Sequence, residues 1–223
     1  MRKKLSVFVG LLLIMLIATS CSSPFQEFSN RGMSEEEVTI TTDDIPEEPD
    51  KQELISKIKG NTSEQIDDVI EANFSLMDVV SGEGNQHAEI YATKRFALSE
   101  LATVLIDAME PEKASEVKDN QQIFIYPDHF VTLKESEEDD NVLLIEVAED
   151  EFVRRNYSPS FLGTYFTFRL LDSLFGNNWS NRRAETCRAG DCYGGYTGKG
   201  YYPDGKPKRG NTTFRGGGPG AGK

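Results

Sequence analysis

The sequence predicts a small α+β domain in which a β-meander packs against two or three helices, flanked by segments that do not fold. Three observations support this prediction. Apolar residues recur at helical spacing in three stretches, and short β-prone runs lie between turn signals. Acidic residues and glycine dominate the sequence before and after this region. The folded domain is therefore expected to span residues 51–180.

The first half of the domain predicts two helices with two strands between them. Thr62 and Gln65 form a capping-box pattern before an apolar face, which indicates a helix over 63–73. Strands are expected at 76–80 and 89–92, on either side of a glycine-containing turn. Ser99 can cap a second helix, and Pro111 would end it.

The second half predicts a meander followed by one long helix. Strands are expected at 123–126, 130–134 and 142–147, with a Pro-Asp turn after the first and an acidic loop before the third. A helix should begin with Ser158 as N-cap and end before Gly176. Its apolar face could pack in the core or dip into a membrane surface. The scarcity of basic residues favours the core.

The composition argues against several classes of protein. The 223 residues include 37 acidic and 24 basic side chains, giving a net charge of −13. Such a charge argues against a nucleic-acid partner, because phosphate contacts need clustered Lys and Arg. Three cysteines and two histidines leave few ligands for a metal site. We predict no catalytic, metal or cofactor-binding residues, and expect a monomer.

The N-terminus has the pattern of a secretory signal peptide. Three positive charges within Met1–Lys4 precede a short apolar stretch, Leu5–Ile17, and small residues lead to Cys21. The apolar stretch is shorter than the roughly 20 residues of a membrane span. Small residues before a cysteine resemble the lipobox of bacterial lipoproteins, although Ala18 stands where leucine is more usual. We expect residues 1–20 to be removed, and Cys21 to carry a lipid that holds the protein on the outer face of the cell membrane. An ordinary cleaved secretory protein is the alternative.

Two segments of opposite charge flank the expected domain. Residues 21–50 carry nine acids and one base, which predicts a disordered acidic tether. Residues 181–223 carry nine bases and three acids and are rich in glycine, which predicts an unfolded basic tail. The tail could bind an anionic wall polymer, anionic lipid or an envelope protein. It could also fold back on the acidic domain, or serve only as a solubilising segment.

Glu146 is the most informative polar residue. Both faces of the strand 142–147 are apolar, so the strand should be buried on both sides and its carboxylate needs a partner. Arg154, Arg155 or a backbone donor could satisfy it in a structural role. The functional alternative is an acid with a perturbed pKa in a cleft, as in a membrane-tethered hydrolase.

Other candidate residues support no stronger hypothesis. Cys187 and Cys192 are expected to form a small disulfide loop in an exported chain. His129 after Asp128 could be a general base, but a turn histidine is the commoner case, and His87 has no partner in the sequence. The acidic loop 135–141 lacks the ligand order of an EF-hand and is interpreted as a solvated hairpin tip.

Three motifs resemble a known family. The stretch 145–162, IEVAEDEFVRRNYSPSFL, together with IFIYPDHF at 123–130 and RGGGPGAGK at the C-terminus, is similar to domain of unknown function 4247 of Gram-positive bacterial lipoproteins. The resemblance covers the sequence from about Lys51 onward. It implies lipid anchoring, a single small domain and a role in envelope maintenance, and it supplies no activity. We therefore expect a non-enzymatic envelope module, with the tethered enzyme as the alternative.

Overall fold

The computed structural model describes residues 39–82, 86–188 and 192–196, which contain a six-stranded antiparallel sheet and seven helices. The fold class predicted from the sequence, α+β, is confirmed, although the helices exceed the two or three expected. The predicted signal peptide, Cys21, most of the tether and the tail beyond residue 196 lie outside the described residues.

The sheet has the strand order β1-β2-β6-β5-β4-β3. Its strands are β1 (Ser75–Ser81), β2 (His87–Thr93), β3 (Lys113–Ala114), β4 (Gln121–Tyr126), β5 (His129–Glu135) and β6 (Leu143–Glu149). The meander expected over 123–147 is present as β4, β5 and β6. The β1–β2 hairpin joins it through the β2–β6 pairing, which places β6 inside the sheet with a neighbour on either side.

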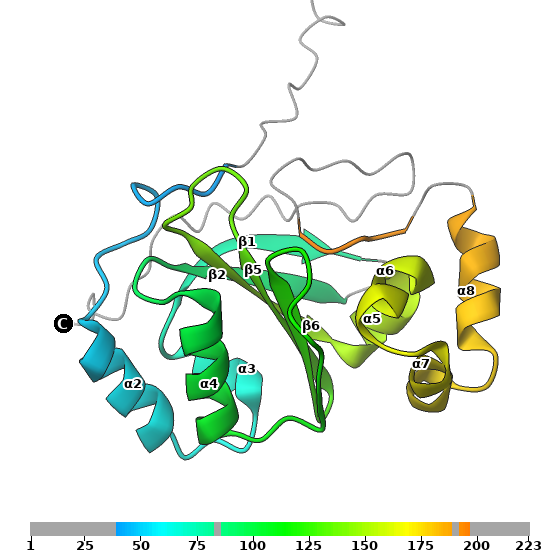
Figure 1. The fold of residues 1–223 in the computed structure, drawn as a ribbon, viewed down its shortest axis with the longest axis horizontal. Helices are drawn as coiled ribbons and strands as arrows, with labels where there is room; N and C mark the ends of the chain where they lie inside the picture. Colours follow the sequence, from blue (N-terminus) through cyan, green and yellow to red (C-terminus); the bar gives the residue numbers. More distant parts are fainter. Residues whose placement is uncertain (1–38, 83–85, 189–191, 197–223) are drawn as a thin grey trace, which may run out of the picture. The chain divides into compact units, whose positions relative to one another are not determined.

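Helices cover both faces of the sheet (Figure 1). One face carries α2 (Lys51–Gly60), α3 (Ile66–Glu71) and α4 (Leu98–Ala108), and the other carries α5 (Asp150–Asn156), α6 (Pro159–Tyr165), α7 (Phe168–Phe175) and α8 (Trp179–Cys187). Alternate β6 side chains enter the two cores: Leu143 and Ile145 pack with the first helices, and Leu144 and Ala148 with the second. The expected two-sided burial of this strand is therefore observed.

The expected helix between Ser158 and Gly176 is two helices. Phe166, which is buried, has an extended backbone that ends α6. The side chain of Thr167 then accepts a hydrogen bond from the Leu170 amide and caps α7. Of the apolar face expected for this helix, Leu162, Phe166 and Phe175 are buried in the core, whereas Leu174 is exposed.

The folded domain is larger than the predicted span 51–180. On the N-terminal side, Ile40 and Ile45 are buried in the same core as α5–α8, so the last part of the expected tether packs on the domain. On the C-terminal side, α8 extends to Cys187, and Tyr193 and Tyr196 are buried. Buried residues thus lie beyond both ends of the predicted span, because average charge and glycine content do not reveal a few large apolar side chains that pack in the core.

Candidate functional site

Glu146 is the centre of a buried polar cluster on the face of the sheet that carries α5–α8. Glu146 is 3% exposed, and in the sheet it lies opposite Thr132 of β5 and Ile90 of β2. The Tyr157 hydroxyl donates to Glu146 Oε1 at 2.8 Å, and the backbone N–H of Tyr196 donates to Oε2 at 3.2 Å. Both oxygens of the buried carboxylate are therefore satisfied.

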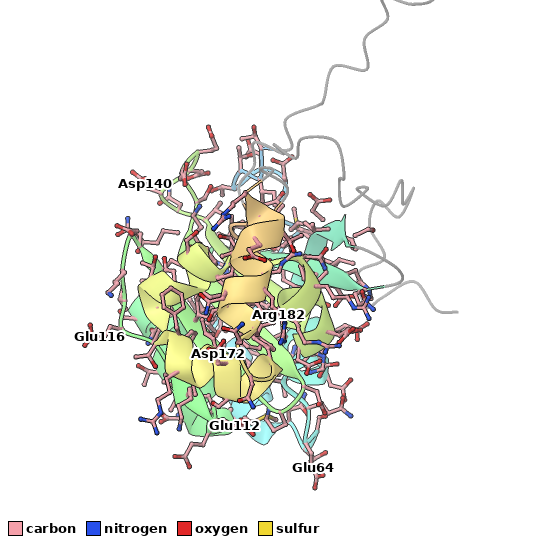
Figure 2. The ribbon with its side chains drawn as sticks, turned by 90° about the vertical axis from the view of Figure 1, so that its right-hand side faces the viewer. Glu64, Glu112, Glu116, Asp140, Asp172 and Arg182 are labelled. Atoms are coloured by element: carbon pink, nitrogen blue, oxygen red, sulfur yellow. A yellow bond between two sulfur atoms is a disulfide. The ribbon has the colours of Figure 1, made fainter. Side chains whose placement is uncertain are left out.

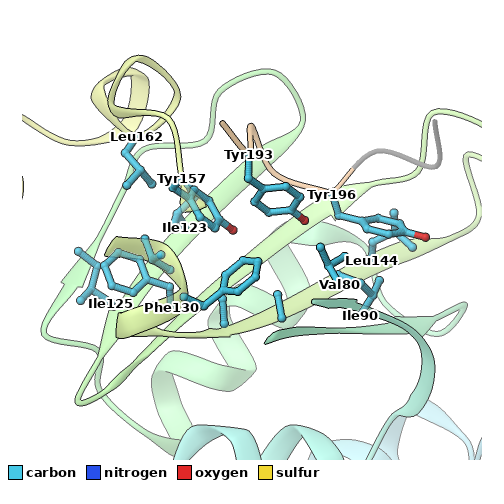
Figure 3. Close-up of a cluster of buried hydrophobic side chains, with 14 of the residues drawn as sticks. Val80, Ile90, Ile123, Ile125, Phe130, Leu144, Tyr157, Leu162, Tyr193 and Tyr196 are labelled. Carbon is cyan, nitrogen blue, oxygen red and sulfur yellow. The ribbon is translucent and has the colours of Figure 1, made fainter. Parts of the chain in front are cut away.

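Three tyrosines lie in a row above this strand, and they come from distant parts of the sequence. Figure 3 shows Tyr157, Tyr193 and Tyr196 side by side in the core. The rings of Tyr157 and Tyr193 meet edge to face, with centroids 4.9 Å apart. Tyr157 follows α5, whereas Tyr193 and Tyr196 follow α8, so the cluster joins β6 to the C-terminal segment 192–196.

The predicted pairing of Glu146 with Arg154 or Arg155 was wrong. Both arginines contact Glu151, three and four residues earlier on α5. The helix begins directly after β6, which puts Glu151 and the arginines on one exposed face, where residues at this spacing are neighbours. The backbone donor, the third predicted partner, is the Tyr196 amide.

The environment of Glu146 changes its acidity. Burial raises the pKa of its carboxyl above the ordinary value. The Tyr193 and Tyr157 hydroxyls, the Tyr196 amide and the charge of Lys134 act in the opposite direction and lower it. The pKa of Glu146 is raised because solvent does not reach the carboxyl. The hydrogen bonds reduce the free-energy cost of burying this polar group.

The C-terminal segment is held by main-chain bonds as well as by side chains. The Tyr193 amide donates to the Asn156 carbonyl, and the Ser158 amide donates to the Tyr193 carbonyl, each at 2.8 Å. The Tyr196 hydroxyl donates to Asp78 Oδ2 on β1 at 3.1 Å. Lys134 Nζ donates to the backbone carbonyl of Tyr196 at 3.4 Å. Sequence reasoning missed these residues. The available signal was that large tyrosines interrupt a glycine-rich stretch.

Cys187 and Cys192 form a disulfide directly before this segment. Cys187 is the last residue of α8, and Cys192 is one residue before Tyr193. Both cysteines line a pocket of about 340 Å³. Its other lining residues are Ser158, Pro159, Ser160, Ala184 and Arg188.

The predicted histidine candidates do not approach Glu146. His129 Nε2 lies 3.6 Å from Asp67 on α3, and His87 Nε2 lies 3.5 Å from Glu89. His129 pairs with Glu149 in the sheet, three residues along β6 from Glu146, or about 10 Å. Within the described ranges, no group of three or more His, Cys, Asp or Glu side chains could hold a metal ion.

The acidic loop 135–141 has a structural contact. Asp139 Oδ2 accepts hydrogen bonds from the Thr42 backbone N–H at 2.9 Å and from the Thr42 hydroxyl at 2.6 Å. The Thr42 hydroxyl, together with the Asn141 and Thr42 amides, holds the pKa of Asp139 well below its usual range. The loop interpreted as a solvated tip therefore fixes the N-terminal segment to the domain.

Comparison with known proteins identifies a family and no individual relative. Residues 54–223 match the model of the family described as Domain of unknown function (DUF4247). No curated protein and no solved structure matches the chain. Among the helices of the described part, none combines the length and the apolar character needed to cross a membrane.

Proposed function

Because the chain belongs to the family described as Domain of unknown function (DUF4247), which names no activity, we propose its function from its own residues. The protein is a lipoprotein on the outer face of the cell membrane, and it acts as a non-enzymatic module that maintains the envelope through binding. Its basic tail binds an anionic wall polymer or anionic lipid, and the chain works as a monomer.

The N-terminal sequence supports the anchor. A charged start, a short apolar stretch and small residues before Cys21 together are typical of a lipidated signal sequence. Acyl chains bind a bilayer with about 0.8 kcal/mol per buried methylene, so two or more chains hold a protein firmly. The 18 residues from Ser22 to Thr39 would reach at most about 60 Å when fully extended.

One observation carries the proposal: the two segments that leave the domain do so beside the same hairpin. Thr42, on the side of Cys21, is bound to Asp139 in the β5–β6 loop. Tyr196, from which the tail continues, contacts Lys134 near the end of β5, and Lys134 also pairs with Glu137 in that loop. The described residues close to the two segments, Thr42 and Tyr196, therefore contact the same hairpin, which supports a joint action of anchor and tail.

Charge separates the roles of the two segments. Residues 21–180 carry a net charge of −22, whereas residues 181–223 carry +6. An anionic surface repels residues 21–180 and attracts residues 181–223. Each Lys or Arg near the surface contributes up to about 1 kcal/mol of binding free energy. Salt screens this attraction over about 10 Å.

The position of Glu146 favours the binding module over the tethered hydrolase. A catalytic acid needs access to its substrate, whereas Glu146 is 3% exposed and both its oxygens accept hydrogen bonds from tyrosines of the core. The arginines and histidines that could have assisted it contact other carboxylates.

The anchor is tested by intact mass and fractionation. Protein from the membrane fraction should begin at Cys21 and carry a diacylglyceryl group, and Cys21→Ala should move the chain out of that fraction. An unlipidated chain that begins elsewhere would contradict the anchor.

The tail is tested with the soluble Cys21→Ala chain and vesicles of phosphatidylglycerol or phosphatidylcholine, or with a poly(glycerol phosphate) polymer. Binding should require the anionic probe, weaken as salt rises, and disappear when the basic residues of the tail become Gln. The residues changed are the six basic residues beyond residue 196, namely Lys199, Lys206, Lys208, Arg209, Arg215 and Lys223. Binding that survives the substitutions or high salt would overturn the role of the tail.

A further inference from the structure

The helices on the two faces of the sheet differ in charge. Residues 39–149, which contain the strands and α2–α4, carry 27 acidic and eight basic side chains. Residues 150–188, which contain α5–α8, carry four acidic and six basic side chains, and all six are arginines. Since α2–α4 and α5–α8 pack on opposite faces of the sheet (Figure 1), the α5–α8 layer is a basic face on an acidic domain. The arginines are Arg154, Arg155, Arg169, Arg182, Arg183 and Arg188.

Helix α7, in this layer, presents apolar side chains to solvent. Among the described residues, five large apolar side chains are exposed, and two of them, Phe168 at 53% and Leu174 at 40%, lie on α7. Leu171 and Phe175 of the same helix are buried in the core. The apolar side chains of α7 therefore extend beyond the part that the core covers. Helices that lie in a membrane interface combine such side chains with Lys or Arg.

The neighbouring helices supply the basic residues that α7 lacks. Helix α7 itself has Arg169, which is exposed. Helix α8 is bonded to α7 through the Ser180 amide, which donates to Asp172 at 2.8 Å, and Figure 2 shows Asp172 and the exposed Arg182 together on the face formed by the two helices. Helix α5 adds Arg154, whose side chain is 43% exposed and whose carbonyl accepts a hydrogen bond from the first residue of α8.

The acidic groups on the other side of the sheet have little influence at this face, because salt limits their range. The Debye length is about 8 Å at physiological ionic strength. The sheet and its helix layers put roughly 20 Å between the outer sides of α2–α4 and α5–α8. An anionic surface against α7 and α8 therefore interacts mainly with the arginines beside it.

We propose that the face formed by Arg154, Phe168, Arg169, Leu174 and Arg182, here called the α7–α8 face, is a docking surface for an anionic lipid bilayer. Its two apolar side chains enter the headgroup region, and its arginines pair with lipid phosphates. The domain then lies with α5–α8 on the membrane and with α2–α4 turned away from it. An anionic bilayer fits this face better than a polyol phosphate polymer, because a polymer of that kind offers nothing apolar to the exposed side chains of α7.

The inference rests on the lipid anchor of the proposed function. Few groups take part in the contact, so the face binds too weakly to hold a free domain on a membrane. A lipid at Cys21 keeps the domain close to the bilayer, which makes docking an intramolecular event at millimolar effective concentration, on the order of that of a short flexible linker. The anchored chain is therefore the form in which the face acts, whereas the tail is tested on the soluble chain.

Hydrogen–deuterium exchange on the anchored chain tests the proposal. The chain that begins at Cys21 is coupled through this thiol, which the Cys187–Cys192 disulfide leaves as the free one of three cysteines, to a maleimide lipid in vesicles of phosphatidylglycerol or phosphatidylcholine. The six basic residues beyond residue 196 are changed to Gln, so that the tail makes no contribution. Peptides of α7 and α8 should exchange about threefold or more slower on phosphatidylglycerol than on phosphatidylcholine, whereas peptides of α2 and α4 should exchange equally on both.

Two pairs of substitutions separate this face from positive charge in general. Arg169→Gln/Arg182→Gln should remove the protection of α7 and α8. Lys57→Gln/Lys59→Gln removes two exposed bases of α2, on the other side of the sheet, and should leave the protection unchanged. Phe168→Ser should weaken the protection without a change in charge. All these side chains are exposed, and thermal melting of each variant checks that it is folded.

Four results would overturn the proposal. They are equal exchange of α7 and α8 on the two lipids, protection of α2 and α4 instead, equal effects of the arginine and lysine pairs, and the same protection when poly(glycerol phosphate) is added to the chain on phosphatidylcholine. The last result would make a wall polymer the partner of this face. Because the lipid is attached chemically, none of these results depends on lipidation in the cell, which intact mass and fractionation decide separately for the proposed function.

Discussion

Glu146 accepts a hydrogen bond from the backbone amide of Tyr196, a residue 50 positions later in the chain. This contact connects an inner strand of the sheet to the last described segment. Every residue type except proline has this amide donor, so the bond to Glu146 depends on the path of the main chain and not on the side chain at position 196. The Tyr196 ring adds packing in the core, and its hydroxyl donates to Asp78.

The first prediction concerns Glu146→Gln. Glutamine offers one acceptor oxygen in place of two, so either the Tyr157 hydroxyl or the Tyr196 amide loses its acceptor. We expect the free energy of unfolding to fall by about 1–3 kcal/mol, the cost of a buried group without a partner. Urea denaturation of the variant and the wild-type chain measures it.

The difference in stability between the wild-type chain and Glu146→Gln should also depend on pH. Since burial raises the pKa of Glu146, its protonated form is the more stable in the folded chain. This stabilisation is fully present below the ordinary value of 4.5 and is lost as the pH rises through the higher folded pKa. Glu146→Gln lacks this dependence. The difference in free energy of unfolding between the wild-type chain and the variant should therefore become smaller above about pH 4.5. A constant or growing deficit would contradict the raised pKa.

The second prediction concerns the arginines of α5. Arg154→Ala and Arg155→Ala remove exposed pairs with Glu151, and each should change the free energy of unfolding by less than about 1 kcal/mol. Tyr157→Phe is the matched comparison, because it removes one donor to the buried carboxylate and should cost about 1–2 kcal/mol. The reverse order would restore the arginines as partners of Glu146.

The third prediction concerns the attachment of the N-terminal segment. Asp139→Ala removes the acceptor for Thr42, so a glutamate-specific protease should cut within 43–48 severalfold faster. Asp140→Ala is the control, because the neighbouring side chain points outward (Figure 2) and should leave cleavage unchanged. Because hydrogen bonds lower the pKa of Asp139, this attachment holds above the ordinary value of 3.8 and weakens as the pH falls through the folded pKa. Equal cleavage in both variants would show that Asp139 does not hold the segment.

The fourth prediction compares two glycines. A Cβ at position 82 would lie 2.8 Å from Cγ of Asn156, which is 6% exposed and donates to the Phe152 carbonyl. Gly82→Ala should therefore cost about 1–3 kcal/mol. A Cβ at position 163 would meet the Phe168 ring at 2.7 Å, but that residue is 53% exposed and can turn away. Gly163→Ala should change stability by less than about 1 kcal/mol, and thermal melting ranks the two.

The sequence pattern predicted those strands whose formation depends on residues close together in the chain. The alternation in 142–147 indicated a strand with two apolar faces, and this was enough to expect a buried Glu146 with a hydrogen-bonded role. Spacing also located the β4–β6 meander, because its strands pair with their neighbours in sequence.

Contacts between distant residues could not be predicted in this way. Arg154 and Arg155 are near Glu146 in sequence, but they lie on the exposed face of α5. The partners of Glu146 are Tyr157, directly after α5, and Tyr196, after α8. The break between α6 and α7 depends on a single cap, Thr167, within a continuous apolar pattern. Helix α2 has only Leu54 and Ile58 buried, so its periodicity is faint, although Asp50 caps it in the ordinary way.

The strand order has a consequence for how the chain folds. The β1–β2 hairpin and the β4–β6 meander each form from nearby residues, but β2 pairs with β6 through partners such as Ala88 with Ala148 and Thr93 with Leu143, 50 to 60 residues apart. Loop closure over such a distance is slow compared with forming a hairpin. During synthesis the backbone of β2 therefore has an unpaired edge until residues up to 149 have emerged. In that interval, the incomplete chain is most exposed to aggregation and proteolysis.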